Sequence, residues 1–409
     1  MTHRIVVVGA SLAGVRAAET LRHEGFEGPI TMIGDERGQP YDRPPLSKQV
    51  LAGDWGLDRV ALPGVASLAD LDWRLGTTAV GLDLGMRRVM LDDGTGVPFD
   101  GLVVATGAAP RQLPGTAEMA GVHTLRTLDD CLAIRAALDA GSSRVAVVGA
   151  GFIGAEVAAT CRARGADVTL IEALPVPLGR VLGPEIGAVC ADLHRDEGVD
   201  VRLGVGVDRL ETDGAGCVAR IHLADSAAIE ADLVVVGIGV VPNTAWLDGS
   251  GLELADGVVC EASMLAAPGV VAAGDVARWP NAAFDGEMMR VEHWDNALAM
   301  GEHAARRLLA EQGSDGAGEV RSPEPFAPVP WFWSDQYDLK IQLAGRAGPG
   351  DDVAVVHGSL EERRFVALYG RNGRVVGALG FNMAARVARY RRAIGERLTW
   401  DEALANADG

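Results

Sequence analysis

Two segments of the chain repeat the same order of apolar strand, glycine turn, helix and second apolar strand. The first begins Arg4-Ile-Val-Val-Val-Gly-Ala-Ser-Leu-Ala-Gly14 and the second Arg144-Val-Ala-Val-Val-Gly-Ala-Gly-Phe-Ile-Gly154. In each, a second apolar run (residues 30–33 and 168–171) is followed by an acidic residue. This is the pattern of a dinucleotide-binding unit, in which parallel strands are buried by helices. One glycine pattern is weak evidence, but two in this context predict an α/β protein with two nucleotide sites.

The glycine turns predict where the nucleotide phosphates bind. Backbone N–H groups at a helix start can approach a pyrophosphate, and the helix dipole favours its negative charge. The second turn is complete, whereas the first has Ser11 in place of its second glycine. A small serine still permits close approach and could itself bond a phosphate. The predicted phosphate-binding positions are Gly9, Ser11 and Gly14 in the first turn, and Gly149, Gly151 and Gly154 in the second.

The acidic residues indicate which nucleotide each site takes. Glu172 lies 23 residues after Gly149, near the distance expected for a carboxylate that binds an adenosine ribose. The following residues, Ala173-Leu-Pro175, offer no cation for a 2′-phosphate, so NADH is favoured over NADPH. Asp35, 26 residues after Gly9, has the same predicted role in the first site, with Glu36 an equally possible ligand.

Two later apolar runs are predicted to complete the first sheet. One ends at Thr106 and Gly107, and the other, much later, at Gly274 and Asp275. If the later run joins the first sheet, it places the aspartate at its end in the first domain. An aspartate there suits a long ligand with a ribityl chain, so we expect FAD in that domain. The predicted domains are therefore FAD-binding over 1–110 and 246–322, NAD-binding over 111–245, and a small C-terminal domain over 323–409 after a proline-rich linker.

Composition excludes several classes of protein. The 409 residues carry a net charge of −19, which argues against nucleic-acid binding. The five cysteines are scattered without a metal-ligand spacing, which favours reduced thiols in a cytoplasmic protein without metal. The longest apolar runs are about half a membrane span, and no export signal is evident, so we expect no membrane association.

Several motifs together resemble one family. The chain is similar to the FAD-dependent ferredoxin reductases of the putidaredoxin-reductase and biphenyl-dioxygenase-reductase type, within the glutathione-reductase-like superfamily. The resemblance covers nearly the whole chain. It implies two Rossmann-like domains plus a small α+β C-terminal domain, and hydride transfer from NADH to FAD with single electrons passed to a ferredoxin that serves a cytochrome P450 or a ring-hydroxylating oxygenase. Besides the two glycine turns, it is carried by Pro40-Tyr-Asp-Arg-Pro-Pro-Leu-Ser-Lys48, Leu125-Arg-Thr-Leu-Asp129, Val236-Gly-Ile-Gly-Val-Val-Pro-Asn243, Ala273-Gly-Asp275, Arg290-Val-Glu-His-Trp-Asp-Asn-Ala297 and Trp331-Phe-Trp-Ser-Asp-Gln336.

The resemblance also implies site residues. The positions implied to contact FAD are Ala13, Asp35, Lys48, Val80, Arg126, Asp275 and Trp294, and Arg43, Ile153, Arg180 and Gly237 join the cofactor-binding set. Lys48 is one of only two lysines beside 35 arginines, and its compact ammonium suits a place near flavin N5. We expect Glu156 to pair with it, so that the two orient nicotinamide and flavin without exchanging protons. A helix from Asn296 to Ala310 would direct its N-terminal dipole at the flavin.

Absent thiols limit the electron acceptor. Disulfide reductases of this superfamily carry a cysteine pair in the segment that here reads Arg43-Pro-Pro-Leu-Ser-Lys48. Electrons must therefore leave for an external acceptor. Alternatives to a ferredoxin reductase are an NADH-dependent rubredoxin reductase and a flavin- and NADH-binding redox sensor like apoptosis-inducing factor.

The C-terminal segment supplies a candidate docking surface. Residues 323–409 hold 11 basic and 11 acidic residues, so this segment is neutral on an acidic chain. Ferredoxins are generally acidic, and Arg386, Arg389, Arg391 and Arg392, with Arg306 and Arg307 as additions, could receive one. A solvated helix face is the competing interpretation. Trp331 and Trp333 could shield the flavin or belong to the core.

Overall fold

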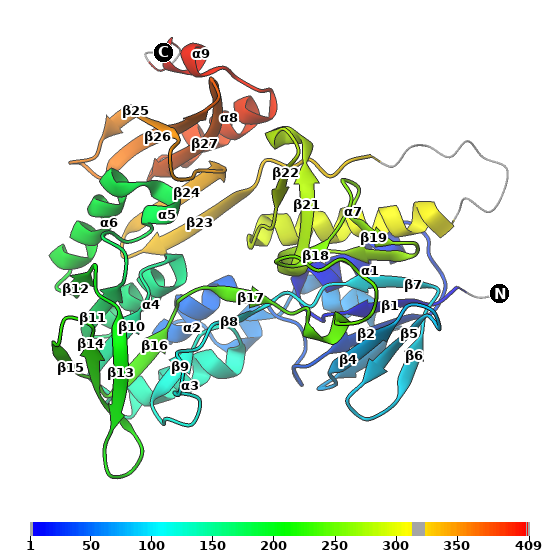
Figure 1. Ribbon diagram of the computed structural model, residues 1–409, viewed down its shortest axis with the longest axis horizontal. Helices are drawn as coiled ribbons and strands as arrows, with labels where there is room; N and C mark the ends of the chain where they lie inside the picture. The colour runs from blue at the N-terminus through cyan, green and yellow to red at the C-terminus, as the bar shows by residue number, and fades with distance from the viewer. Residues whose placement is uncertain (1–2, 313–323, 406, 408–409) are drawn as a thin grey trace. The chain divides into compact units, whose positions relative to one another are not determined.

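A computed structural model describes residues 3–312, 324–405 and 407 of the chain (Figure 1). The chain divides into two compact units, neither of which is continuous in sequence. Unit 1 comprises Met1–Asp42, Ala61–Ala109 and Val241–Pro330, and unit 2 comprises Arg43–Val60, Pro110–Val240 and Trp331–Gly409. Each unit is described by itself below.

Unit 1 is built on a six-stranded sheet in the order β19-β20-β7-β1-β2-β3. All its strand pairs are parallel except β19 with β20. Strands β1 and β7 are buried throughout, as expected for strands covered on both faces. Helices α1 and α7 pack closely together in this unit. The bounds are β1 Ile5–Val8, α1 Leu12–His23, β2 Ile30–Gly34, β3 Asp72–Leu75, β7 Gly101–Val104, β19 Leu265–Ala267, β20 Val270–Ala272 and α7 Trp294–Gln312.

Unit 2 contains a second parallel sheet, in the order β12-β11-β10-β16-β9. Strands β10 and β16 are again apolar and buried, and the glycine turn after β10 leads directly into α4. The bounds are β9 Val122–Thr124, α3 Leu128–Asp139, β10 Arg144–Val148, α4 Phe152–Ala163, β11 Asp167–Glu172, α5 Gly179–Leu182, α6 Pro184–Asp196, β12 Asp200–Leu203 and β16 Leu233–Val236.

The C-terminal part of unit 2 is an antiparallel sheet with two short helices after it. One face of this sheet shares a core with α6, in which Ile186, Cys190 and Leu193 meet Ile341 and Phe365. The C-terminal segment is therefore joined to the second nucleotide fold by apolar packing. In the order β23-β24-β27-β26-β25, the bounds are β23 Trp331–Gln336, β24 Leu339–Gly345, β27 Arg374–Phe381, β26 Arg364–Arg371 and β25 Asp352–Ser359, followed by α8 Ala384–Gly395 and α9 Trp400–Ala405.

The remaining elements are short. Three small sheets pair β4-β5-β6, β18-β21-β22 and β13-β14-β15. Their bounds are β4 Ala79–Asp83, β5 Arg88–Leu91, β6 Gly96–Pro98, β13 Val207–Thr212, β14 Val218–Leu223, β15 Ala228–Glu230, β18 Val258–Val259, β21 Ala277–Asn281 and β22 Glu287–Met289; α2 (Gln49–Ala52), β8 (Ala108–Pro110) and β17 (Val240–Pro242) complete the set named in Figure 1.

The predicted fold class is confirmed: two Rossmann-like sheets and a small C-terminal β domain with an arginine-rich helix are present. Three details differ from the sequence analysis. Helix α7 begins at Trp294, two residues before the predicted Asn296. Strand β23 was not predicted, and residues 43–60 pack with unit 2 although they follow the first nucleotide motif. Among the described residues, no helix has the length and apolar character required to cross a bilayer.

Candidate functional site

The first and third glycines of both turns are required by the fold itself. Gly9 has φ +117° and Gly149 has φ +98°, in the left-handed region where a side chain is strained. A Cβ at Gly9 would lie 2.0 Å from the Ala105 carbonyl oxygen, and one at Gly149 would lie 2.3 Å from the Gly237 carbonyl oxygen. At Gly14 and Gly154 a Cβ would lie 2.0 Å from the carbonyl oxygen of the turn's own first glycine. These four glycines allow strand, turn and helix to pack closely.

The second position of each turn has no such packing constraint. A Cβ added at Gly151 would meet no atom within 4 Å, and its φ of −73° suits any residue. Gly151 and Ser11 are the N-cap residues of α4 and α1, and neither helix start has a side-chain capping bond. The N-terminal N–H groups of both 12-residue helices are therefore not satisfied by a cap, and Gly151 leaves open space beside them.

The predicted ribose-binding acids are held differently in the two units. Glu172, at the end of β11, accepts hydrogen bonds from the Ala150 N–H at 2.8 Å and the Leu174 N–H at 2.9 Å. In unit 1, Asp35 is exposed and accepts a bond from the adjacent Glu36 N–H. Glu36 accepts a 2.5 Å bond from the Tyr41 hydroxyl. The structure thus ties Glu172 to the backbone of its glycine turn.

The later strands of unit 1 bring Gly274 to α1, since a Cβ at Gly274 would lie 3.0 Å from the Cβ of Ala13. Thr106 and Asn243 are joined by two hydrogen bonds of 2.8 Å. The Thr106 hydroxyl donates to the Asn243 main-chain carbonyl, and the Asn243 side-chain amide donates to the Thr106 main-chain carbonyl. Asp275 follows Gly274 in a single 3-10 turn. Gly107, like Gly274, has a positive φ. The predicted turn residues of unit 1 are therefore rigidly placed.

Trp294 and His293 lie where α7 begins. The Trp294 indole donates to Asp42 Oδ1 at 2.7 Å, which fixes the orientation of the ring. Burial lowers the pKa of the His293 imidazole to about 4, although the nearby Asp275 carboxylate acts in the opposite direction. The ring therefore stays neutral at physiological pH.

The predicted catalytic pair, Lys48 and Glu156, is in contact. Lys48 Nζ lies 2.8 Å from Glu156 Oε2, and the Glu156 side chain is 3% exposed. Ser47 Oγ donates to the same oxygen at 2.5 Å. The other oxygen, Oε1, accepts bonds from Ser334 Oγ at 2.7 Å and the Asp335 N–H at 3.3 Å. A buried carboxylate with one cation and three neutral donors is fixed in place as a charge, because each lone-pair direction has a partner.

Two further predicted residues are also brought together. The Arg43 guanidinium donates to the Arg126 carbonyl oxygen at 2.6 Å, and the Arg126 N–H donates to Asp130 Oδ2 at 2.9 Å. Asp130 belongs to a capping box at the start of α3. The loop before α3 thereby holds the segment that carries Lys48.

Other predicted residues stand apart from these contacts. Val80, Ile153 and Arg180 are exposed, on β4, α4 and α5 respectively. Gly237 lies beside Gly149, in line with its predicted place at the second turn. Trp331 and Trp333 stack on each other with ring centroids 5.4 Å apart.

The cysteines are not arranged for redox chemistry. All five are free, and only Cys217 is exposed. Burial raises the pKa of the Cys131 thiol to about 11 and those of Cys161, Cys190 and Cys260 to about 12. Among the described residues, no group of three or more potential metal ligands occurs.

The arginines proposed for docking differ in their surroundings. On α8, Arg389 and Arg392 are exposed, whereas Arg386 is half-buried and contacts the His357 ring at 3.1 Å. Arg306 pairs with Glu24 and Glu302, and Arg307 with Glu261 and Glu311, so the charges of both are compensated locally.

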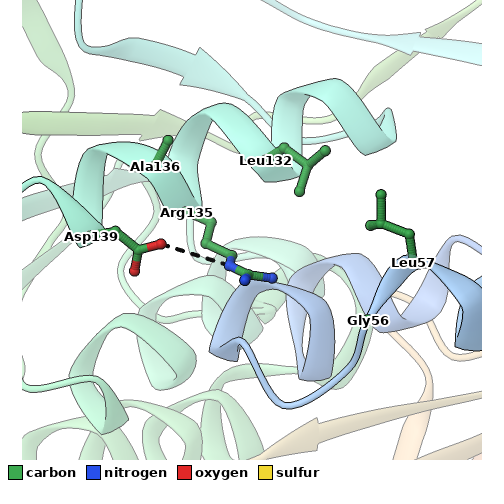
Figure 2. A pocket seen from close by; sticks show the side chains of 6 residues that line it. All are labelled: Gly56, Leu57, Leu132, Arg135, Ala136 and Asp139. Carbon is green, nitrogen blue, oxygen red and sulfur yellow. Dashed lines mark ion pairs between the residues drawn. The ribbon is translucent and has the colours of Figure 1, made fainter.

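A cavity of about 390 Å³ lies elsewhere in unit 2, between α3 and the residues after α2 (Figure 2). Its two charged side chains, Arg135 and Asp139, lie 3.8 Å apart and pair with each other. None of the residues predicted to bind a cofactor lines it. Its walls are Gly56, Leu57, Leu132, Arg135, Ala136 and Asp139.

Sequence reasoning missed several partners of these side chains. Ser47, Ser334 and Asp42 stand inside the motifs quoted above, but nothing in their own residue type marks them as partners of Glu156 or Trp294. Asn243 and Asp130 were likewise not singled out. Their only sequence signal is position: Asp42, Ser47, Asn243 and Ser334 lie within the quoted motifs, and Asp130 directly follows one.

Comparison with known proteins agrees with this geometry. Residues 3–301 match the family described as pyridine nucleotide-disulphide oxidoreductase, and residues 331–408 match the reductase C-terminal family. The 5,5'-dehydrodivanillate O-demethylase ferredoxin reductase subunit of Sphingobium sp. (strain NBRC 103272 / SYK-6) is 38% identical over 411 residues, 98% of this chain and 96% of that protein. The ferredoxin–NAD(+) reductase component of the p-cumate 2,3-dioxygenase system of Pseudomonas putida is 36% identical over 406 residues, 97% of this chain and 94% of that protein.

Solved structures extend the agreement to three dimensions. The covalent complex of putidaredoxin reductase with putidaredoxin matches with a TM-score of 0.89 and 33% identity, over 97% of this chain and 94% of that chain. With two glycine turns, a buried lysine–glutamate pair and a matching C-terminal sheet, the chain belongs to the pyridine nucleotide-disulphide oxidoreductase family and carries the reductase C-terminal domain.

Proposed function

We propose that this protein is an NADH-dependent ferredoxin reductase that contains FAD and supplies a small iron–sulfur protein of an oxygenase system. The observation that carries the proposal is that the segment Arg43-Pro-Pro-Leu-Ser-Lys48, where disulfide reductases hold their cysteines, instead presents Lys48 bound to Glu156. The relatives named as ferredoxin reductase components of oxygenase systems support the choice of acceptor.

The residues present fit both nucleotides. Gly151 leaves space beside uncapped N–H groups at the start of α4, which suits a pyrophosphate, and Glu172 adds an acceptor for a ribose diol. NADH would be held there, with Gly149, Gly154, Ile153 and Gly237 around the turn. FAD would be held by the equivalent turn of unit 1 together with Asp35 or Glu36, Thr106, Asp275 and Trp294.

When bound, NADH supplies a hydride and FAD converts it into single electrons. The contribution of the chain is to orient the reacting groups and to exclude cysteine chemistry. Glu156 keeps its carboxylate buried and fixes the Lys48 ammonium in one place, because Ser47 and Lys48 share one of its oxygens. Neither group needs to exchange a proton for this role. Burial of four of the five thiols raises their pKa values and disfavours the thiolate form that cysteine chemistry needs.

We assign ferredoxin docking to α8, where Arg389 and Arg392 are exposed. Rim charges act mainly on association, so Arg389→Glu with Arg392→Glu should raise KM for ferredoxin several-fold and leave NADH:ferricyanide turnover unchanged. The matched control is Arg202→Glu, an exposed arginine on β12. If the double variant and the control change KM for ferredoxin equally, α8 does not belong to the docking surface.

The function is tested by following NADH-driven reduction of a panel of two-iron ferredoxins and rubredoxins with the purified yellow protein. Rapid reduction of a ferredoxin is the expected result. Preferential reduction of rubredoxin would favour the rubredoxin reductase alternative, and slow NAD release with poor reduction of every carrier would favour a redox sensor. The five free cysteines are in keeping with a reducing compartment, and we place the protein in the cytoplasm on that basis.

A further inference from the structure

A buried polar cluster in unit 2 has no part in the function proposed so far. His194 on α6 and Gln336 at the end of β23 are both 0% exposed. His194 Nδ1 lies 2.9 Å from the hydroxyl of Tyr337, which follows Gln336. Tyr337 has φ +57°, in the left-handed region, within the two-residue link between β23 and β24. Buried polar groups that satisfy only part of their hydrogen-bonding capacity require a reason beyond packing.

The cluster is connected to Glu156 through Ser334. Gln336 Nε2 donates to Ser334 Oγ at 3.3 Å, and Ser334 Oγ lies 2.7 Å from Glu156 Oε1. A serine hydroxyl has one proton, and this proton is donated to the carboxylate without competition when the other neighbour of the hydroxyl is a donor. The amide nitrogen of Gln336 is that donor. With the Gln336 amide reversed, its oxygen would compete with Glu156 for the proton of Ser334.

His194 is the other fully buried polar side chain of this cluster. Within the described part of the chain, His194 Nε2 and Gln336 Oε1 are both buried without a hydrogen bond of standard geometry. Burial lowers the pKa of the His194 imidazole to about 4, and the Gln336 side chain acts in the opposite direction. The neutral ring has a single N–H. If Tyr337 donates to Nδ1, the proton is on Nε2 and is available to Gln336 Oε1, whereas the other tautomer would set two acceptors against each other.

Packing fixes the strand that carries these groups against the helix that carries Glu156. Phe332 and Phe152 meet edge to face with centroids 4.5 Å apart. Phe152 and Glu156 are four residues apart on α4, and Phe332 and Ser334 are two apart on β23, so each pair lies on one face of its element. The aromatic contact thus sets the position at which Ser334 meets Glu156.

We propose that Gln336, oriented by His194 and Tyr337, is a positioning residue for the reaction: through Ser334 it anchors Glu156 Oε1, and through Glu156 it fixes the Lys48 ammonium. In the proposed order the donors run in one direction, from Tyr337 to His194, Gln336, Ser334 and Glu156, and its last two steps are hydrogen bonds of the structure. The C-terminal sheet is thereby part of the machinery that sets the lysine position. This inference rests on the proposed function for the role of Lys48, but not for the hydrogen-bond order.

The hydrogen-bond order is tested by ¹⁵N NMR of the FAD-loaded protein labelled at histidine. The expected His194 signals are those of a neutral ring protonated at Nε2. Gln336→Met, which removes the amide at similar volume, should shift His194 toward a mixture of tautomers. Signals of an Nδ1-protonated ring in the wild type, or no change in Gln336→Met, would overturn the proposal whether or not the protein reduces ferredoxin.

The positioning role is tested by kinetics with NADH and ferricyanide. Ser334→Ala and Gln336→Met should each lower kcat about tenfold with KM for NADH changed less than about twofold. The first removes and the second weakens the bond from Ser334 to the Glu156 carboxylate, which displaces Lys48 and not the nucleotide. Tyr337→Phe, the variant least able to disturb folding, should lower kcat about two- to threefold and alter the charge-transfer absorbance of the NADH-reduced protein.

Two matched controls separate positioning from stability. Ser263 is also buried and donates to a glutamate, Glu261, at 2.6 Å in unit 1. Tyr369 is also buried and donates to the Leu182 carbonyl at 2.9 Å in unit 2. Ser263→Ala and Tyr369→Phe should retain wild-type kcat. Equal losses of kcat in the controls, or a wild-type kcat in Ser334→Ala, would refute the role, whereas failure of the wild type to reduce ferredoxin would count against the proposed function alone.

Discussion

The two nucleotide folds are the same where the fold requires it and different where a ligand would bind. In both, the first and third glycines have no room for a side chain. In both units an arginine at the start of the first strand is hydrogen-bonded to an aspartate, Arg4 to Asp100 in unit 1 and Arg144 to Asp232 in unit 2. The second turn position and the strand-end acid differ. Comparing the two units therefore separates the residues that build the fold from those that choose the nucleotide.

The largest expected effect comes from adding a methyl group at the first glycine. Gly149→Ala should destabilise the protein by about 3 kcal/mol or more, because backbone strain at positive φ is joined by a clash with the Gly237 carbonyl. Gly165→Ala is the matched control, with φ +88° and no atom within 4 Å of the new Cβ, and should cost about 1 kcal/mol. Thermal unfolding measures both. The same Tm for the two variants would mean that the close contact is not needed.

Exchanging the second turn residue tests the difference between the units. Gly151→Ser should leave the unfolding temperature nearly unchanged, since space is open there, yet weaken NADH binding about tenfold by filling the approach to the helix start. Ser11→Gly should alter FAD retention far less. Titration of each nucleotide measures these affinities, and undiminished NADH affinity in Gly151→Ser would show that the open space is not used.

The strand-end acid should decide coenzyme choice in unit 2. Glu172→Gln removes the like charge opposed to a 2′-phosphate, so the ratio of kcat/KM for NADH to that for NADPH should fall about fivefold. Asp35→Asn changes an exposed acid, and its effect on FAD retention should be smaller than the roughly fivefold effect of Glu172→Gln on coenzyme preference. Steady-state kinetics with both coenzymes provide the measurement. A wild type indifferent between NADH and NADPH would contradict the role of Glu172.

The smallest expected effect is on stability and concerns the two arginine–aspartate pairs. Hydrogen bonds from Arg144, against the opposing effect of burial, lower the pKa of Asp232 from 3.8 to about 2. For Asp100, burial acts against the bonds from Arg4, and the pKa is lowered overall. A depressed carboxyl pKa stabilises the fold above the unfolded pKa, and this stabilisation is lost as pH falls from about 4 toward 2.

Asp232→Asn should therefore cost about 1 kcal/mol at pH 7, a small figure because the pair is near the surface, and Asp100→Asn should cost less. Urea unfolding at pH 7 and pH 3 measures the difference between each variant and the wild type. That difference should shrink at pH 3. A cost for Asp232→Asn that is the same at both pH values would show that the ionised carboxylate is not its source.

The sequence predicted the parts that local patterns specify. Both parallel sheets follow from apolar strands beside glycine turns, and Lys48 with Glu156 was found through a motif although the two residues lie 108 positions apart. The role of residues 331–336 could not be predicted in the same way. Ser334 and Gln336 are ordinary polar residues in a strand, and His194 lies on a helix more than 130 residues away. Only the tertiary packing of β23 on α4 and α6 brings them to Glu156.

The interleaving of the two units in the sequence has a consequence for synthesis on the ribosome. Unit 1 is incomplete until its segment ending at Pro330 has been made, and unit 2 until the segment from Trp331 to Gly409 has followed. Since chains are made from the N-terminus, neither unit can close its core early, and long-range contacts must form near or after release. Half-finished chains thus expose apolar sheet surface for most of translation. A truncation at residue 330 would leave α6 without the sheet that covers it.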